Sequence, residues 1–230
     1  WGYTFVKVFK NRDEKLNKIL KPFGLTWPQF IPCWRSFYIL RSAGRIKNDK
    51  ELEAIIQWVV KKEIPVKKII EITAESHLIP KEHIDVVKKL KKKYKVGILS
   101  NNVQGWADRV LKNYKIENLF DALIVSSKVG VRKPDVLIYY TALKKFSVKP
   151  EETIFVADEM AEDLVPATGL GMKTIWLKPS RTGWWNKNDE KILEIYQPDG
   201  IIKNFGEISQ IIRKLEKIWK PEFSEIKKLA

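Results

Sequence analysis

From residue 96 onward, short apolar runs alternate with segments of helical periodicity. The apolar runs cover 96–99, 122–125, 154–156, 174–177 and 201–202, and the helical segments cover 106–113, 136–146, 164–170 and 208–218. Nearly continuous apolar strands separated by helices of about ten residues indicate a parallel sheet covered on both faces and joined by right-handed crossovers. The sequence therefore predicts an α/β fold with a doubly wound, Rossmann-like parallel sheet.

Polar residues follow several of these strands. Ser100 and Asn101 end the first, Asp158 ends the third, and Lys133 lies in the glycine-containing loop after the second. In open parallel sheets, ligands bind beyond the carboxyl ends of the strands. We therefore expect these four residues to converge on one site.

Residues 11–79 have a different texture. Apolar residues recur there at helical spacing with aromatic residues between them, and no strand-like alternation of useful length is evident. We expect a helical insert at 11–79 and a core domain formed by 1–10 and 80–230.

Charge and composition narrow the class of partner. The chain has 43 Lys+Arg against 28 Asp+Glu, a net charge of +15, which favours an anionic small-molecule substrate. Paired lysines also motivate a nucleic-acid-binding alternative, but no recognition motif accompanies them.

No apolar run approaches the roughly 18 residues of a membrane span, and no secretory leader is evident, so a cytoplasmic protein is expected. The lysine-rich, cysteine-poor composition is also seen in proteins from hot environments.

Three segments carry a family resemblance. Residues 98–102 resemble the second motif of the haloacid dehalogenase (HAD) superfamily, a strand that ends in Ser or Thr. Residues 130–135 resemble the third, a loop with a Lys-Pro pair. Residues 155–163 resemble the fourth, with Asp158 and Asp163 five positions apart. The order and spacing of the three segments make the resemblance specific, and it implies a HAD-like core with a helical cap at 11–79.

The resemblance implies a hydrolase that works through a covalent aspartyl intermediate on a small phosphorylated or halogenated metabolite. Ser100 and Asn101 would hold a substrate oxygen, and Lys133 would neutralise the charge of the transferring group. In a phosphatase, which we favour, Asp158 and Asp163 would hold Mg²⁺. In a dehalogenase no metal is implied, and Asp158 would orient the hydrolytic water.

The first motif departs from the family pattern. Its nucleophilic Asp is expected two residues before Trp1, so the first strand is expected upstream of the sequence. Trp1 then stands where phosphatases of the family have a second Asp, Tyr3 stands at the usual Thr position, and Ala157 replaces a Gly. These departures motivate a second hypothesis, a catalytically inactive HAD-like binding or scaffold protein.

Each site residue also has an ordinary structural interpretation. Ser100 and Asp158 are typical helix-capping residues, Lys133 is one of many lysines, and Asp163 is favoured at the start of a helix by the helix dipole. Aromatic residues of the insert line either a substrate pocket or the core of the insert: Trp27, Phe30, Trp34, Phe37, Tyr38 and Trp58. Arg35 and Arg41 are possible anion clamps, more commonly surface residues, and no zinc site is expected at His77 or His83.

Overall fold

The computed structural model describes residues 4–8, 11–180 and 188–226, the side chains of 219–226 excepted. The chain divides into two compact units. The first comprises Trp1–Pro80 and Lys95–Ser147, and the second comprises Lys81–Tyr94 and Val148–Ala230. Parallel strands and helices occur in both, so the predicted α/β class is confirmed. Among the helices that the structure describes, none has the length and apolarity to cross a membrane.

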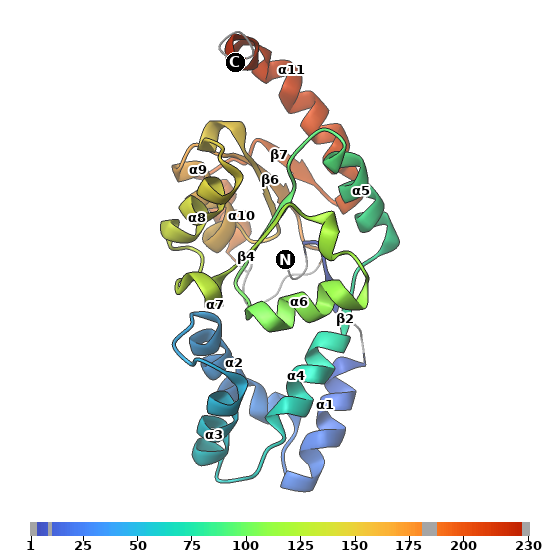
Figure 1. Ribbon diagram of the computed structural model, residues 1–230, viewed down its shortest axis with the longest axis vertical. Helices are drawn as coiled ribbons and strands as arrows, with labels where there is room; N and C mark the ends of the chain where they lie inside the picture. Colours follow the sequence, from blue (N-terminus) through green and yellow to red (C-terminus); the bar gives the residue numbers. More distant parts are fainter. Residues whose placement is uncertain (1–3, 9–10, 181–187, 227–230) are drawn as a thin grey trace. The chain divides into compact units, whose positions relative to one another are not determined.

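Four helices form the N-terminal part of the first unit, where they lie side by side (Figure 1): α1 (Arg12–Leu20), α2 (Trp27–Ser42), α3 (Asp49–Val60) and α4 (Val66–Glu75). Local signals set their starts. The Gln29 side chain accepts a hydrogen bond from the Thr26 backbone N–H at 2.9 Å, and the Asn48 side chain accepts one from the Glu51 N–H, also at 2.9 Å. The helical prediction for this segment is therefore confirmed.

The apolar faces of these helices enclose a common core. Leu16 and Leu20 of α1, Leu52 and Ile56 of α3, and Ile69 of α4 are fully buried. One short strand was missed: β2 (His77–Leu78) pairs antiparallel with β1 (Lys7–Val8). Two residues are too few to show an alternating pattern.

The rest of the first unit contains β3 (Gly97–Ser100) and β4 (Ala122–Val125), which pair in parallel with Ser100 opposite Val125. Three helices accompany them: α6 (Gln104–Asn113), α7 (Ser126–Val129) and α8 (Val136–Phe146). The helix α7 was not predicted, because a single turn carries no periodicity and its two serines suggested only a polar strand end.

In the second unit, β5 (Ile154–Ala157), β6 (Lys173–Leu177) and β7 (Gly200–Ile202) form a parallel sheet in that order. The described strands thus form two parallel sheets, one in each unit, where the sequence predicted one. Apolar runs identify strands but not their partners. The helices of this unit are α5 (Lys81–Lys91), α9 (Val165–Gly169), α10 (Asp189–Leu193) and α11 (Ile208–Ile226).

The segment predicted as one helix over 164–170 begins earlier, as a π-helical turn, Met160–Leu164, that leads into α9. Pro166 supplies a physical reason, because it has no N–H to donate and its ring crowds the preceding turn. Single π turns occur often at functional sites. The division into a core and a cap at 11–79 stays a prediction.

The end of α2 packs against α7 through backbone contacts. The Ser126 hydroxyl donates to the Ser42 carbonyl at 2.6 Å, and the Arg132 guanidinium donates to the Ser42 hydroxyl. Gly44 follows with a φ of +71°, and a Cβ at this position would lie 2.9 Å from the Ser127 carbonyl oxygen. Only glycine satisfies both the left-handed backbone and the close approach.

We expect Gly44→Ala to destabilise the protein more than Gly24→Ala. Both glycines have a positive φ, at +71° and +66°, so each substitution costs about 1–2 kcal/mol of backbone strain. At Gly24 the nearest atom to an added Cβ is the Lys62 Nζ at 3.7 Å, whereas at Gly44 the contact with backbone adds about 1–3 kcal/mol. Urea unfolding of both variants measures the difference, and equal losses would contradict the packing of α2 on α7.

Candidate active site

The predicted site residues of the first unit lie together. Asn101, just after β3, makes two hydrogen bonds to the backbone of Lys133: its Nδ2 donates to the Lys133 carbonyl at 3.0 Å, and its Oδ1 accepts from the Lys133 N–H at 2.8 Å. Ser100 is 2% exposed and Lys133 is 6% exposed. The burial of Lys133 excludes its interpretation as one more solvated lysine. The end of β3 and the loop before α8 therefore meet as predicted.

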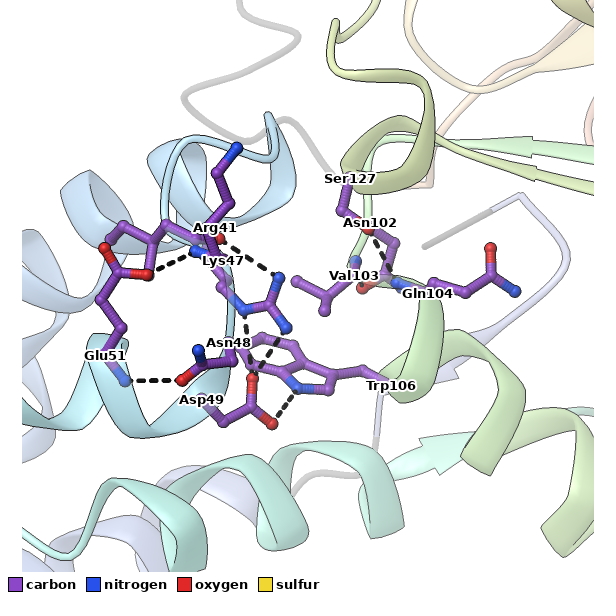
Figure 2. A network of polar contacts seen from close by, with 11 residues as sticks. Arg41, Lys47, Asn48, Asp49, Glu51, Asn102, Val103, Gln104, Trp106 and Ser127 are labelled. Carbon is purple, nitrogen blue, oxygen red and sulfur yellow. Dashed lines mark hydrogen bonds and ion pairs between the residues drawn. The ribbon is translucent and has the colours of Figure 1, made fainter.

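Other residues than Ser100 cap the helix that follows β3. The Asn102 Oδ1 accepts from the Val103 N–H at 2.7 Å, and the Ser127 Oγ accepts from the Gln104 N–H at 2.9 Å (Figure 2). Val103 is the N-cap position of α6. The start of α6 thus depends on Asn102 and Ser127, and the interpretation of Ser100 as its capping residue is not supported.

Tyr38 of α2 reaches the same strand end. Its hydroxyl donates to the Asn101 carbonyl at 2.8 Å, and the Arg132 guanidinium lies 5.9 Å from the centre of its ring. Burial raises the pKa of Tyr38 to about 12, against the opposing effect of Arg132, so the hydroxyl stays protonated and remains a donor at neutral pH. The sequence suggested Tyr38 only as a pocket aromatic, and no motif revealed this hydrogen bond.

The acidic residues of the fourth motif belong to the second unit. Asp158 follows β5, and Asp163 lies in the π-helical turn; each is 6% exposed. The Asp158 carbonyl accepts a hydrogen bond from the Trp176 Nε1 at 3.2 Å. The N-cap of the turn is Glu159, so Asp158 does not occupy the capping position that its ordinary interpretation requires.

A third acid, Asp189 of α10, lies close to Asp158, and sequence analysis did not identify it. Asp189 is 4% exposed, and its Oδ2 has no hydrogen-bond partner among the residues that the structure describes. Burial raises the pKa of Asp189 to about 6; the Met160 backbone N–H opposes the shift, and the negative charges of Asp158 and Glu190 add to it. Concentrated negative charge at Asp158 and Asp189 makes this position favourable for a cation.

The aromatic residues of the insert differ in their surroundings. Trp27, Phe30 and Trp34 belong to the core of the four helices, and Trp27, Trp34 and Tyr38 also line a hollow beside it, whereas Trp58 is 72% exposed. Arg41 pairs with Asp49 at 3.1 Å. Trp1 and Tyr3 lie outside the described residues, as do Trp184 and Trp185, for which the sequence leaves open an exposed contact patch or packing on the core.

The two histidines belong to different units. The His77 Nδ1 lies 3.3 Å from the Ala74 carbonyl oxygen, and the buried His83 stacks on Phe205 with 4.3 Å between ring centres. Within the described ranges, no three His, Cys, Asp or Glu side chains gather in a way that would hold a metal. A metal at the acidic residues would thus take its remaining ligands from water or substrate.

The family model for haloacid dehalogenase-like hydrolases matches residues 38–177, and the chain belongs to this family. It is 29% identical over 174 residues to a glyceraldehyde 3-phosphate phosphatase of Pyrococcus furiosus. This alignment covers 74% of this chain and 65% of the relative. It is 28% identical over 132 residues to the pyrophosphatase PpaX of Bacillus mycoides, covering 57% and 58% respectively. The chain thus spans less than two thirds of either relative.

Solved structures share the fold. A HAD family enzyme of Bacteroides thetaiotaomicron, in complex with magnesium and inorganic phosphate, aligns with a TM-score of 0.66 and 24% identity over 80% of this chain and 93% of that one. The L-2-haloacid dehalogenase of Xanthobacter autotrophicus aligns with a TM-score of 0.62 and 14% identity, covering 90% and 94%. The chain therefore shares the HAD-like fold with both of these enzymes.

Replacing Asn101 tests whether its side chain holds the Lys133 loop. We expect Asn101→Ala to lower the free energy of unfolding by about 1–3 kcal/mol, because the buried N–H and carbonyl of Lys133 lose their partners. Asn113→Ala, at an exposed position near the end of α6, should change stability by less than about 0.5 kcal/mol. Urea denaturation measures both, and an unchanged Asn101→Ala variant would rule out this role.

The shifted pKa of Asp189 predicts a pH dependence. Between its ordinary value of 3.8 and about 6, the folded protein binds more protons at this carboxyl than the unfolded chain does. Rising pH therefore removes stability across this interval. We expect Asp189→Asn to gain stability relative to the unmodified protein from pH 4 to pH 6, with little further change above. Unfolding curves in EDTA without Mg²⁺ measure this; a constant difference would show that burial does not shift this carboxyl.

Proposed function

We propose that this chain is part of a phosphatase that hydrolyses a small phosphorylated metabolite through a covalent aspartyl intermediate. The observation that carries the proposal is the pair of hydrogen bonds between the Asn101 side chain and the backbone of the buried Lys133, which join the loop before α8 to the end of β3. The phosphatase names of the relatives from Pyrococcus furiosus and Bacillus mycoides favour phosphate over halide. The net charge of +15 suits an anionic substrate.

In this proposal, Lys133 neutralises the charge that develops on the transferring phosphoryl group. Ser100 and the backbone N–H groups beside it hold a phosphoryl oxygen. Tyr38 keeps the strand end in position through its bond to the Asn101 carbonyl. The nucleophile is the Asp that the family pattern places two residues before Trp1.

Asp158 and Asp163 fit the requirements of Mg²⁺. Mg²⁺ usually binds proteins through one or two carboxylates, and waters and substrate phosphates complete its shell. Both carboxylates are buried, and a third buried carboxyl, Asp189, lies close to Asp158, so a cation there would offset negative charge. When bound, Mg²⁺ would neutralise charge on the phosphoryl oxygens. The Bacteroides thetaiotaomicron enzyme is itself described in complex with magnesium and phosphate.

The deciding experiment assays the full-length gene product against a panel of phosphate monoesters and 2-haloacids, with and without Mg²⁺. We expect Mg²⁺-dependent phosphate release, reduced at least about 100-fold by Asp158→Asn because a metal-binding charge is lost. Glu63→Gln, which removes an exposed carboxylate in the first unit, should leave the rate unchanged.

Two other results would contradict the proposal. Halide release that needs no metal would identify a dehalogenase, in which Asp158 orients water. The absence of activity with both panels would favour the catalytically inactive binding or scaffold protein that Trp1, Tyr3 and Ala157 suggest.

A further inference from the structure

A hollow of about 200 Å³ lies within the first unit, bordered by α1, α2, α4 and α6. Its lining combines aromatic faces with positive charge: Trp27, Trp34, Tyr38 and Trp106 supply the rings, and Arg12 and Arg35 supply the charge. None of the predicted catalytic residues lines it. Its volume is below the range of about 300–1,000 Å³ typical of drug-sized ligands, so it suits a small molecule or one end of a larger one.

Stacking and a hydrogen bond fix the aromatic side chains that line the hollow. Trp106 stacks on Trp34 with 5.9 Å between ring centres and 10° between ring planes, and on Tyr38 at 5.8 Å and 23°. The Trp106 Nε1 donates to the Asp49 Oδ2 at 3.1 Å, while Arg41 holds the Asp49 Oδ1 (Figure 2). Fixed, stacked rings favour a flat or apolar ligand surface over an extended polar one.

The charge of the lining is positive. Among the described residues that line it, none is Asp or Glu. Arg12 pairs at 2.8 Å with Asp13, but Asp13 is a largely exposed carboxylate, and such pairs are weak because water screens them. His77 also lines the hollow; burial lowers its pKa, and the positive charge of Arg12 adds to that effect, so it is neutral at pH 7. The positive charge therefore comes from the two arginines, which bind carboxylate and phosphate well.

The hollow adjoins the candidate site inside the same unit. Tyr38 lines the hollow, and its hydroxyl donates to the carbonyl of Asn101, whose side chain holds Lys133. Asn102, the next residue of this strand end, lines the hollow as well. A second hollow of about 290 Å³ beside α6 has mixed charge from Asp108, Lys112 and Glu117, and its lining includes neither Tyr38 nor Asn102.

We propose that the aromatic hollow is an anion-selective subsite for the leaving group of the substrate. The substrate class is then a small phosphate monoester whose alcohol part carries a second anionic group, a carboxylate or another phosphate, next to a flat or apolar portion. The assignment of the bound molecule as a substrate rests on the proposed function. The selectivity of the hollow for anions follows from its lining alone.

Binding tests the hollow without any reaction. We would titrate the full-length protein with benzoate and with benzamide, its neutral counterpart, and follow tryptophan fluorescence, since three of the lining residues are tryptophans. We expect benzoate to bind at least about 10-fold more tightly than benzamide. Arg35→Gln should remove most of this preference, and Arg45→Gln, which removes an exposed arginine of the same unit, should keep it. Arg12→Gln provides a second variant if Arg35→Gln does not fold.

A kinetic comparison links the hollow to the substrate. With phosphate monoesters that differ only by a carboxylate on the alcohol, Arg35→Gln should lower kcat/KM at least about 10-fold for the carboxylate-bearing ester and leave the neutral one unchanged. Equal binding of benzoate and benzamide, or equal kinetic losses for both esters, would overturn the subsite. Anion-selective binding without phosphate release would support the subsite and contradict the proposed phosphatase activity instead.

Discussion

The arrangement of the first unit depends on one side-chain amide. Asn101 stands at the end of β3 and satisfies both the N–H and the carbonyl of Lys133, in a loop 32 residues further along the chain. Buried backbone N–H and carbonyl groups without hydrogen-bond partners would lower the free energy of unfolding. The Asn101 side chain provides these partners at the loop that carries the buried Lys133. The same residue offers its own carbonyl to Tyr38 of α2. A strand, a loop and a helix therefore meet at one position.

The sequence predicted the bounds of two elements near this position correctly. The strand at 122–125 and the helix at 136–146 have the predicted bounds, because buried strands and amphipathic helices leave strong patterns. Ser100, Lys133, Asp158 and Asp163 were recognised from motif spacing, and all four are buried. The spacing of these residues pointed to the family to which the chain belongs, because such residue types at these intervals rarely occur together by chance; their roles in a site remain a prediction.

The sequence did not predict the hydrogen bond of Tyr38 or the position of Asp189. Both depend on contacts with residues far away in the sequence, and no local pattern around either residue indicates these contacts. The pairing of strands into two sheets also depends on distant partners, which apolar runs do not encode. The short elements α7 and β2 fall below the length at which periodicity is visible. Local sequence patterns thus predicted helices, strands and motifs. The pairing of strands and the contacts between distant side chains depend on tertiary structure, which these patterns do not encode.

The bond from Tyr38 to Asn101 also limits how this protein can change during evolution. One face of Tyr38 belongs to the wall of the aromatic hollow, and its hydroxyl supports the strand that carries Ser100. Replacing Tyr38 would therefore change the lining of the hollow and remove the support of the strand end at the same time. Arg12 of α1 and Thr73 of α4 line the same hollow, but Arg12 pairs with Asp13 and the Thr73 hydroxyl donates to the Ile69 carbonyl, both within their own helices. The lining of the hollow can therefore change on those two helices without loss of the hydrogen bond that Tyr38 of α2 makes to the strand end.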